Sequence, residues 1–161
     1  MSYDIGSSVS QVLWVCEKAQ FSCAELYHFF AARFKDDRKI FHLWLMTAME
    51  EENRARLFAL MAKLRHDNII ASVELELVEA EECLQHVLTL VQQAKETPPT
   101  LLEAVETGME LEGRMSRLMR ENVVKFADDS FEKSFVAMTN MKHLEEIHLA
   151  CRQLADGGRE S

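Results

Sequence analysis

A glutamate and a histidine near the end of the chain have the spacing of a metal-binding pair. Glu145 and His148, in the stretch KHLEEIHLAC, are three residues apart and would share one face of a helix. Met138, Met141 and Leu149 nearby indicate that this face is buried. Carboxylate oxygen and imidazole nitrogen are ligands of divalent cations, so the pair predicts a metal site.

Three more polar residues, Gln20, Glu51 and Glu112, stand halfway along helical stripes that are otherwise apolar. Gln20 and Glu51 are 31 residues apart, and Glu112 and Glu145 are 33 apart, so two helical hairpins would bring all four to one level. Three converging carboxylates would repel one another, and burial would raise their pKa values. A divalent cation would relieve this repulsion. Arg54, one turn beyond Glu51, can supply part of the positive charge instead.

Apolar stripes at helical spacing predict an all-α protein with four long helices. The expected single domain consists of a helical hairpin over about 8–66, a long helical crossover over about 67–99, a second hairpin over about 100–155 and a frayed tail over 156–161. Short hairpin turns around one long crossover are the connectivity of a ferritin-like antiparallel four-helix bundle.

Each of the first three long helices has an expected buried stripe. The first stripe is Val9, Leu13, Cys16, Gln20, Cys23, Tyr27, Phe30 and Phe34. The second is Phe41, Trp44, Ala48, Glu51, Ala55, Phe58 and Ala62. The third is Leu102, Val105, Met109, Glu112, Ser116, Met119, Val123 and Phe126. Each stripe therefore has one of the polar residues near its middle.

Capping residues and turns mark the expected helix boundaries. Ser8 with Gln11, and Thr100 with Glu103, have the spacing of a capping box. The chain is expected to turn at KDDRK, and the crossover to contain its own helix, EAEECLQHVLTLVQQAKE, before a Pro-Pro stop. These features separate the two hairpins.

Composition narrows the class of protein. The 161 residues are 48% apolar and include 18 basic and 27 acidic side chains. A formal charge of −9 argues against nucleic acid and against an anionic membrane as partners. No apolar run approaches the roughly 20 residues that span a bilayer, and the N-terminus does not read as an export signal. A cytoplasmic protein is therefore expected, with Cys16, Cys23, Cys83 and Cys151 as buried thiols.

The stretches AQFSCAELYHFFA, LWLMTAMEEENRARLF, GMELEGRMSRLM and KHLEEIHLAC resemble the ferritin-like di-iron carboxylate proteins, in particular the rubrerythrin branch without its rubredoxin domain. The resemblance covers about 11–153. In that family, helices one and three each give a Glu ligand, and helices two and four each give Glu-x-x-His. The matching metal ligands are Glu51, Glu112, Glu145 and His148.

Two positions depart from the family pattern. Gln20 stands where the family has Glu, and Arg54 stands where it has His. Both would have been terminal ligands of the same iron; Gln coordinates weakly, and Arg cannot coordinate because it does not lose its proton. The resemblance therefore implies that one of the two metal positions survives, with iron or another divalent ion bound once per chain.

The resemblance implies an iron-dependent oxidoreductase that acts on oxygen or peroxide, although no catalytic residue is assigned. A homodimer is expected, with an external electron donor because the chain has no C-x-x-C knuckles. The alternative is a degenerate ferritin-like scaffold or a metal sensor without activity, in which Arg54 replaces the metal in a closed network with the glutamates.

Overall fold

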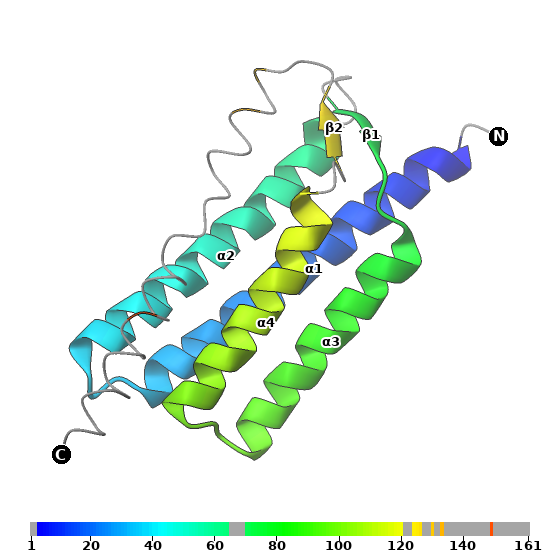
Figure 1. Ribbon diagram of the computed structural model, residues 1–161. Coiled ribbons are helices and arrows are strands. Elements are labelled where there is room, and N and C mark those ends of the chain that lie inside the picture. The colour runs from blue at the N-terminus through cyan, green and yellow to red at the C-terminus, as the bar shows by residue number, and fades with distance from the viewer. Residues whose placement is uncertain are drawn as a thin grey trace.

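The computed structural model describes the backbone of residues 3–64, 70–120 and 124–126 and three single positions, Ser130, Lys133 and Leu149. Side chains are described for 9–63, 73–115 and those three positions. The elements in chain order are α1 (Tyr3–Arg33), α2 (Arg38–Leu64), β1 (Ile70–Val73), α3 (Leu77–Glu96), α4 (Leu101–Arg120) and β2 (Val124–Phe126) (Figure 1). Within these ranges the protein is helical apart from two short strands, and this confirms the all-α class.

The first two helices form the expected hairpin. The turn falls at the predicted KDDRK stretch, where Asp37 caps α2: its Oδ1 accepts hydrogen bonds from the backbone N–H groups of Lys39 and Ile40 at 3.0 and 3.2 Å. A turn this short makes α1 and α2 antiparallel neighbours, as Figure 1 shows.

The buried stripes of the hairpin follow the prediction closely. On α1, the positions from Leu13 to Phe30 in the predicted stripe are all buried, and on α2 the same holds from Trp44 to Phe58. The predicted start of α1 is wrong, because the helix begins at Tyr3 and Ser8 lies inside it. No proline precedes Ser8, so the backbone can continue the helix toward the N-terminus.

Helix α3 confirms the helix predicted inside the crossover, and it is part of the core. Figure 1 shows α1 and α4 in the middle, one in front of the other, with α2 on one side and α3 on the other. Helix α1 packs against both α2 and α3. The buried side of α3 is formed by Ala80, Cys83, Val87, Val91 and Ala94. The crossover therefore contributes a packed helix and not only a connection.

The buried side of α4 differs from the predicted stripe. Val105 and Glu112 are buried as expected, but Leu102 is 58% exposed and Met109 is 39% exposed. The side chains buried in the same stretch are Ala104, Val105, Leu111, Glu112 and Met115. Within this stripe Met115 Sδ accepts from the Cys83 thiol of α3 at 3.1 Å, whereas Glu112 accepts from Tyr27 on α1 and from Arg54 on α2. The prediction that Leu102 and Met109 belong to the buried stripe is therefore wrong, because burial on α4 depends on how the helices pack and not on the spacing of apolar residues alone.

The end of the third predicted helix is also different. Helix α4 ends at Arg120, and Phe126, which the prediction placed on this helix, lies in strand β2. Strand β2 pairs antiparallel with β1, with Ile70 opposite Phe126 and Val73 opposite Val124. Both segments contain β-branched residues, which favour extended pairing once the two segments are brought together. The fourth predicted helix, about 130–155, lies outside the described residues except for single positions.

The capping box predicted at the start of α4 is present. Thr100 Oγ1 accepts from the Glu103 backbone N–H at 3.2 Å, and Glu103 Oε1 accepts from the Thr100 backbone N–H at 3.2 Å. The Thr100 hydroxyl also donates to the same carboxylate at 2.8 Å. These hydrogen bonds hold the pKa of Glu103 below its usual value.

Replacing Thr100 by alanine is expected to lower the free energy of unfolding by about 1 kcal/mol, because the Glu103 N–H loses its side-chain acceptor. Thr100→Ser keeps the hydroxyl and should retain most of this stability. Urea unfolding of both variants measures the difference. An equal loss for serine and alanine would show that the capping bond is not the cause.

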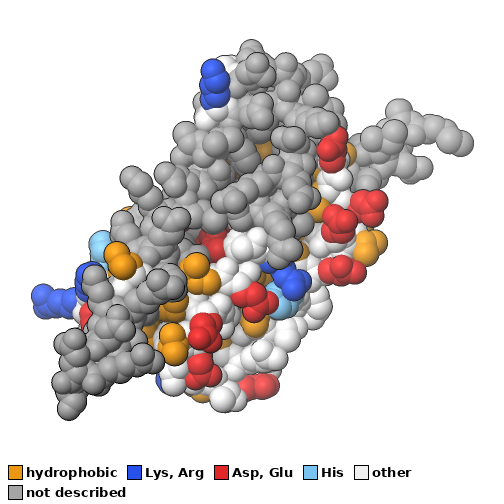
Figure 2. All heavy atoms as spheres, viewed as in Figure 1, with side chains coloured by type: hydrophobic (Ala, Val, Ile, Leu, Met, Phe, Trp, Pro, Cys, Tyr) orange, Lys and Arg blue, Asp and Glu red, His pale blue; other side chains and the backbone are white. Residues whose placement is uncertain are grey.

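Acidic side chains are prominent on the described part of the face in Figure 2. Figure 2 shows acidic side chains spread over α3 and α4 with hydrophobic side chains between them. None of the described helices is long and apolar enough to cross a membrane.

Candidate metal centre

The polar residues predicted at mid-height of the helices are buried. Gln20 and Glu51 are each 1% exposed, Glu112 is 3% exposed and Arg54 is 4% exposed. They come from three helices, α1, α2 and α4, and they are surrounded by the apolar core. We call these four residues the polar cluster.

The register of the α1–α2 hairpin places Gln20 opposite Glu51. Tyr27 on α1 and Trp44 on α2 pack with their ring centroids 5.6 Å apart. Gln20 lies seven residues before Tyr27, and Glu51 lies seven residues after Trp44. Because the helices are antiparallel, a step of two turns in each brings Gln20 and Glu51 to the same level.

Arg54 joins the two described carboxylates of the polar cluster. One of its terminal nitrogens donates to Glu51 Oε1 on its own helix and to Glu112 Oε2 on α4, the second at 3.3 Å. All three side chains are at least 95% buried. The guanidinium therefore links α2 to α4 through the interior.

Tyr27 is the second described hydrogen-bond donor to Glu112. Its hydroxyl donates to Glu112 Oε1 at 3.2 Å, so each oxygen of this carboxylate accepts one hydrogen bond. The Tyr27 ring is fixed by Trp44 and Phe30, whose centroids lie 5.6 and 6.4 Å away. These contacts hold the tyrosine hydroxyl at the polar cluster.

Two buried oxygens of the polar cluster, Gln20 Oε1 and Glu51 Oε2, accept no hydrogen bond from the described part of the chain. Both oxygens of Glu112, in contrast, accept one each from Tyr27 and Arg54. A buried acceptor without a donor costs about 1–3 kcal/mol. The Gln20 and Glu51 oxygens therefore need a proton donor or a cation. The indole nitrogen of Trp44 is also unpaired, and its ring lies at the level of Tyr27.

Burial raises the pKa of Glu51 well above its usual value, and the nearby Glu112 carboxylate raises it further. The guanidinium of Arg54 acts in the opposite direction and only partly compensates. A carboxylate in this position gains a proton readily unless a second positive charge is nearby.

Arg54 in the polar cluster and Tyr27 beside it also have shifted pKa values. Burial alone would lower the pKa of Arg54, but the Glu51 and Glu112 carboxylates raise it, so the guanidinium stays charged. Burial and the neighbouring Glu112 raise the pKa of Tyr27 well above its usual value. The tyrosine is therefore a neutral hydrogen-bond donor at physiological pH.

The structure brings Gln20, Glu51, Arg54 and Glu112 together in one core, while the other two predicted ligands, Glu145 and His148, lie outside the described residues. Over the ranges with described side chains, no group of three or more His, Cys, Asp or Glu could hold a metal ion. Two carboxylates and one amide oxygen are the donors that this part of the chain offers.

The hydrogen bond from Tyr27 to Glu112 was not foreseen from the sequence. Tyr27 stood in the predicted stripe of α1 as a packing residue, two turns from Gln20. That spacing indicates that it faces the interior, but a partner on α4, 85 residues away, depends on how the helices pack.

The described cysteines are buried thiols, as predicted. Cys16, Cys23 and Cys83 are free. Burial raises the pKa of Cys23 well above its usual value, and the neighbouring Glu51 and Glu112 carboxylates raise it further. A neutral thiol at Cys23 therefore lies beside the polar cluster. Cys151 is outside the described residues.

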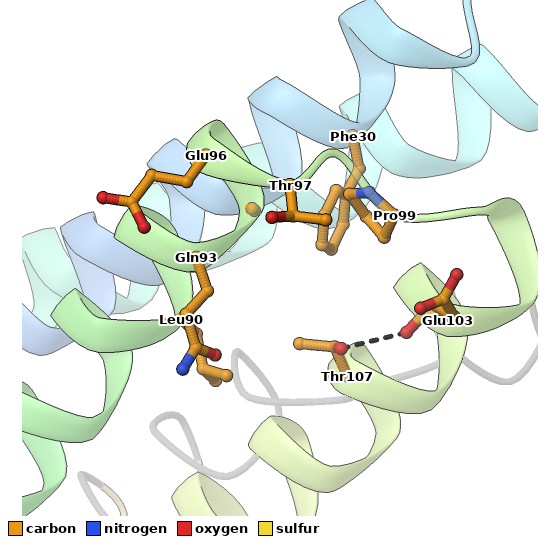
Figure 3. Close-up of a pocket in the computed structure, with 9 residues that line it drawn as sticks. Phe30, Leu90, Gln93, Glu96, Thr97, Pro99, Glu103 and Thr107 are labelled. Atoms are coloured by element: carbon orange, nitrogen blue, oxygen red, sulfur yellow. Dashed lines mark hydrogen bonds between the residues drawn. The ribbon is translucent and has the colours of Figure 1, made fainter.

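A separate pocket of about 350 Å³ lies at the turn between α3 and α4. Figure 3 shows Phe30 and Pro99 on one side of it and Thr107 on the other, with the Glu96 side chain pointing away. Thr107 Oγ1 donates to the Glu103 carbonyl within its own helix. No member of the polar cluster lines this pocket, so it does not open onto the cluster.

Comparison with family models, with curated proteins and with solved structures found no match to this chain. The fold and the site define an all-α protein with a buried cluster of two carboxylates, an arginine and a glutamine. The support for a ferritin-like assignment is therefore the resemblance of the four sequence stretches and the polar residues that they contain.

Proposed function

We propose that this protein is a ferritin-like metal-binding protein that holds one divalent cation, iron by resemblance, at the polar cluster. The observation that carries the proposal is the charge balance: among the residues with described side chains, Glu51 and Glu112 share one guanidinium, that of Arg54. With both carboxylates ionised, these three side chains sum to −1. A protein interior stabilises such an excess only with a further proton or cation.

The same charge balance favours one ion over two. The fourth helix expected from the sequence adds Glu145, and the cluster then sums to −2. One divalent ion brings this sum to zero, whereas a second would leave two uncompensated positive charges in the interior. In the family pattern the second ion occupies the place that Arg54 has here.

The donors present fit a hard cation. Glu51 Oε2 is buried and accepts no hydrogen bond, so it can coordinate without breaking the contact between Arg54 and Oε1. Glu51, Glu112, Glu145 and His148 are the residues that would hold the ion, with the oxygen and nitrogen ligands that iron and manganese accept. A bound iron would exchange electrons with oxygen or peroxide, as the resemblance implies.

The residues around the cluster would control water and protons at such a site. Trp44 is 0% exposed and Phe30 is 1% exposed, so this end of the cluster is closed to solvent. Tyr27 keeps its proton and donates it in a hydrogen bond to Glu112. Arg54 fixes the Glu51 and Glu112 carboxylates relative to each other.

A second candidate function is a metal-free scaffold, and the double contact of Arg54 favours it. The guanidinium already reaches both Glu51 and Glu112, and one proton on Glu51 would make the three side chains neutral. In this case the protein would act through a partner, for example as a homodimer, and the polar cluster would be structural.

Metal analysis decides between the two candidates. Protein expressed in iron-rich medium and freed of loosely bound metal is expected to contain one ion per chain, measured by plasma mass spectrometry. Two ions per chain would contradict the single-ion site. No ion after loading with iron, manganese or zinc would contradict metal binding and favour the metal-free scaffold. A peroxide challenge followed by optical spectroscopy then tests turnover of the loaded protein.

A further inference from the structure

We propose that the protein forms a homodimer in which the outer side of α1 packs antiparallel against α1 of a second copy. The contact surface consists of Trp14, Lys18, Phe21 and Glu25, which we call the α1 seam. This inference concerns the outside of the helices and does not depend on the metal proposed for their interior.

The α1 seam is exposed although three helices contact α1. Helices α2 and α3 pack beside it, and Tyr27 on its inner side reaches α4. Trp14 is 53% exposed and Phe21 is 41% exposed, and no other aromatic ring with a described side chain is exposed. The seam residues are four, three and four residues apart, so they form one line along the helix, away from Tyr27. This is the spacing with which one helix packs along another.

The apolar surface is continuous and extends onto α3. The Lys18 ammonium lies over the Trp14 ring, 4.1 Å from its centroid, and so stays within the seam. Lys95 on α3 donates to Glu25 at 2.8 Å, which places this side of α3 beside the seam. Leu88, two turns before Lys95 on the same side of α3, is 42% exposed. An exposed apolar surface rimmed by charged side chains is typical of a protein interface.

The charges of the α1 seam select a second copy in antiparallel orientation. Lys18 lies three residues before Phe21, and Glu25 lies four residues after it. When Phe21 faces Phe21 of the second copy, Lys18 of each copy comes to the level of Glu25 of the other, to within about one residue rise of 1.5 Å. A two-fold axis makes this contact twice. In a parallel orientation, each of these charges would face its own equivalent and repel it.

The same register brings aromatic rings together across the interface. Phe21 packs against its equivalent at the two-fold axis. Trp14 comes close to the level of Phe29 of the second copy, and Phe29 is partly buried on α1. Aromatic side chains contribute most of the binding energy in many protein interfaces. The antiparallel contact therefore buries the exposed rings and pairs the charges at once.

The first test is sedimentation equilibrium of the full chain in the presence of a chelator, where the wild type is expected to have the mass of a dimer. Phe21→Glu places two like charges at the two-fold axis, and it is expected to raise the Kd of the dimer at least about thirtyfold. Leu60→Glu is the matched control: this position on α2 is 47% exposed and lies outside the seam, so the variant should dimerise as the wild type does.

Tryptophan fluorescence gives a second measurement of the same contact. Trp14 and Trp44 are the two tryptophans of the chain, and Trp44 is already 0% exposed. Emission that moves to shorter wavelength as the protein concentration rises therefore reports burial of Trp14. Phe21→Glu should abolish this shift over the same concentrations.

Exchange of the two seam charges tests the orientation. Lys18→Glu and Glu25→Lys are each expected to weaken self-association about tenfold, because each makes like charges face one another. An equimolar mixture of the two variants should form a heterodimer, since Glu then faces Lys at both contacts.

Three results would overturn the proposal: a wild type that stays monomeric at every concentration, a Phe21→Glu protein that dimerises as the wild type does, or a Leu60→Glu protein that dissociates equally. Charge variants that self-associate as the wild type does would overturn the antiparallel orientation. All of the substituted positions are exposed, and circular dichroism confirms that each variant is folded. None of these outcomes depends on metal binding, so the proposed function stands or fails separately.

Discussion

Replacing Arg54 by methionine is expected to lower the free energy of unfolding of the metal-free protein by about 3–5 kcal/mol at neutral pH. The side chain is 4% exposed and is the guanidinium shared by Glu51 and Glu112. Its removal leaves two buried carboxylates facing each other with no positive charge among the described residues of the cluster. Urea unfolding in the presence of a chelator measures the loss.

The loss is expected to grow as the pH rises. Burial and Glu112 raise the pKa of Glu51 in the folded protein, so between its ordinary value of 4.5 and the raised value the folded state binds a proton that the unfolded chain has lost. Stability then decreases with increasing pH across that window. Because Arg54 lowers the pKa of Glu51, its removal widens the window and prolongs the decrease.

Arg56→Met is the matched control for this experiment. Arg56 lies on the same helix, but its side chain is 64% exposed and its ion pair with Glu52 is 3.7 Å long. Removing it should cost less than about 1 kcal/mol. The double variant Arg54→Met with Glu51→Gln should recover much of the lost stability, because it removes one of the repelling charges. A cost for Arg54→Met no larger than that for Arg56→Met would contradict the role of the guanidinium.

The hairpin and its polar residues could be predicted because they depend on local patterns. The apolar stripe of α1 repeats at steps of three and four, and Gln20 is its one interruption at mid-height. The apolar stripe of α2 has the same spacing, and Glu51 is the polar residue at its middle. The Thr100 cap likewise depends on residues three apart, and the structure contains it.

The arrangement of α3 and α4 could not be predicted in this way, because it depends on contacts between distant segments. The crossover sequence indicates a helix but not which neighbours it packs against. The contact of Cys83 on α3 with Met115 on α4 is one example, and the exposure of Leu102 and Met109 on α4 is another. Pairing of β1 with β2 is a similar long-range contact.

The polar cluster was predictable in its membership but not in its hydrogen bonds. The sequence places Arg54 one turn from Glu51, and either a closed network or a vacant metal position is consistent with that spacing. Only the packed helices show that the guanidinium also reaches Glu112, and that Gln20 Oε1 and Glu51 Oε2 find no partner among the described residues. The hydrogen bonds of the polar cluster therefore follow from the packing and not from the residue types.

The double variant Gln20→Glu with Arg54→His is expected to bind two divalent ions per chain, one more than the single ion proposed for the wild type. Removing the guanidinium takes away one positive charge, and the new carboxylate adds one negative charge, so the cluster becomes more negative by two. A second divalent ion supplies that charge, and the imidazole and the carboxylate supply its terminal ligands in the pattern of the resembled family. Plasma mass spectrometry of the iron-loaded variant counts the ions.

The matched control for this variant makes the same chemical changes at exposed positions of the same helices. Gln11→Glu with Arg56→His alters the total charge equally, and it should bind the same number of ions as the wild type. A count of two in this control would mean that overall charge, and not the buried position, determines loading. A count of one in the Gln20→Glu, Arg54→His protein would contradict this prediction. It would mean that Gln20 and Arg54 are not what prevents a second ion from binding. Chelation should destabilise this variant more than the wild type, because its metal-free cluster has no guanidinium to offset the carboxylates.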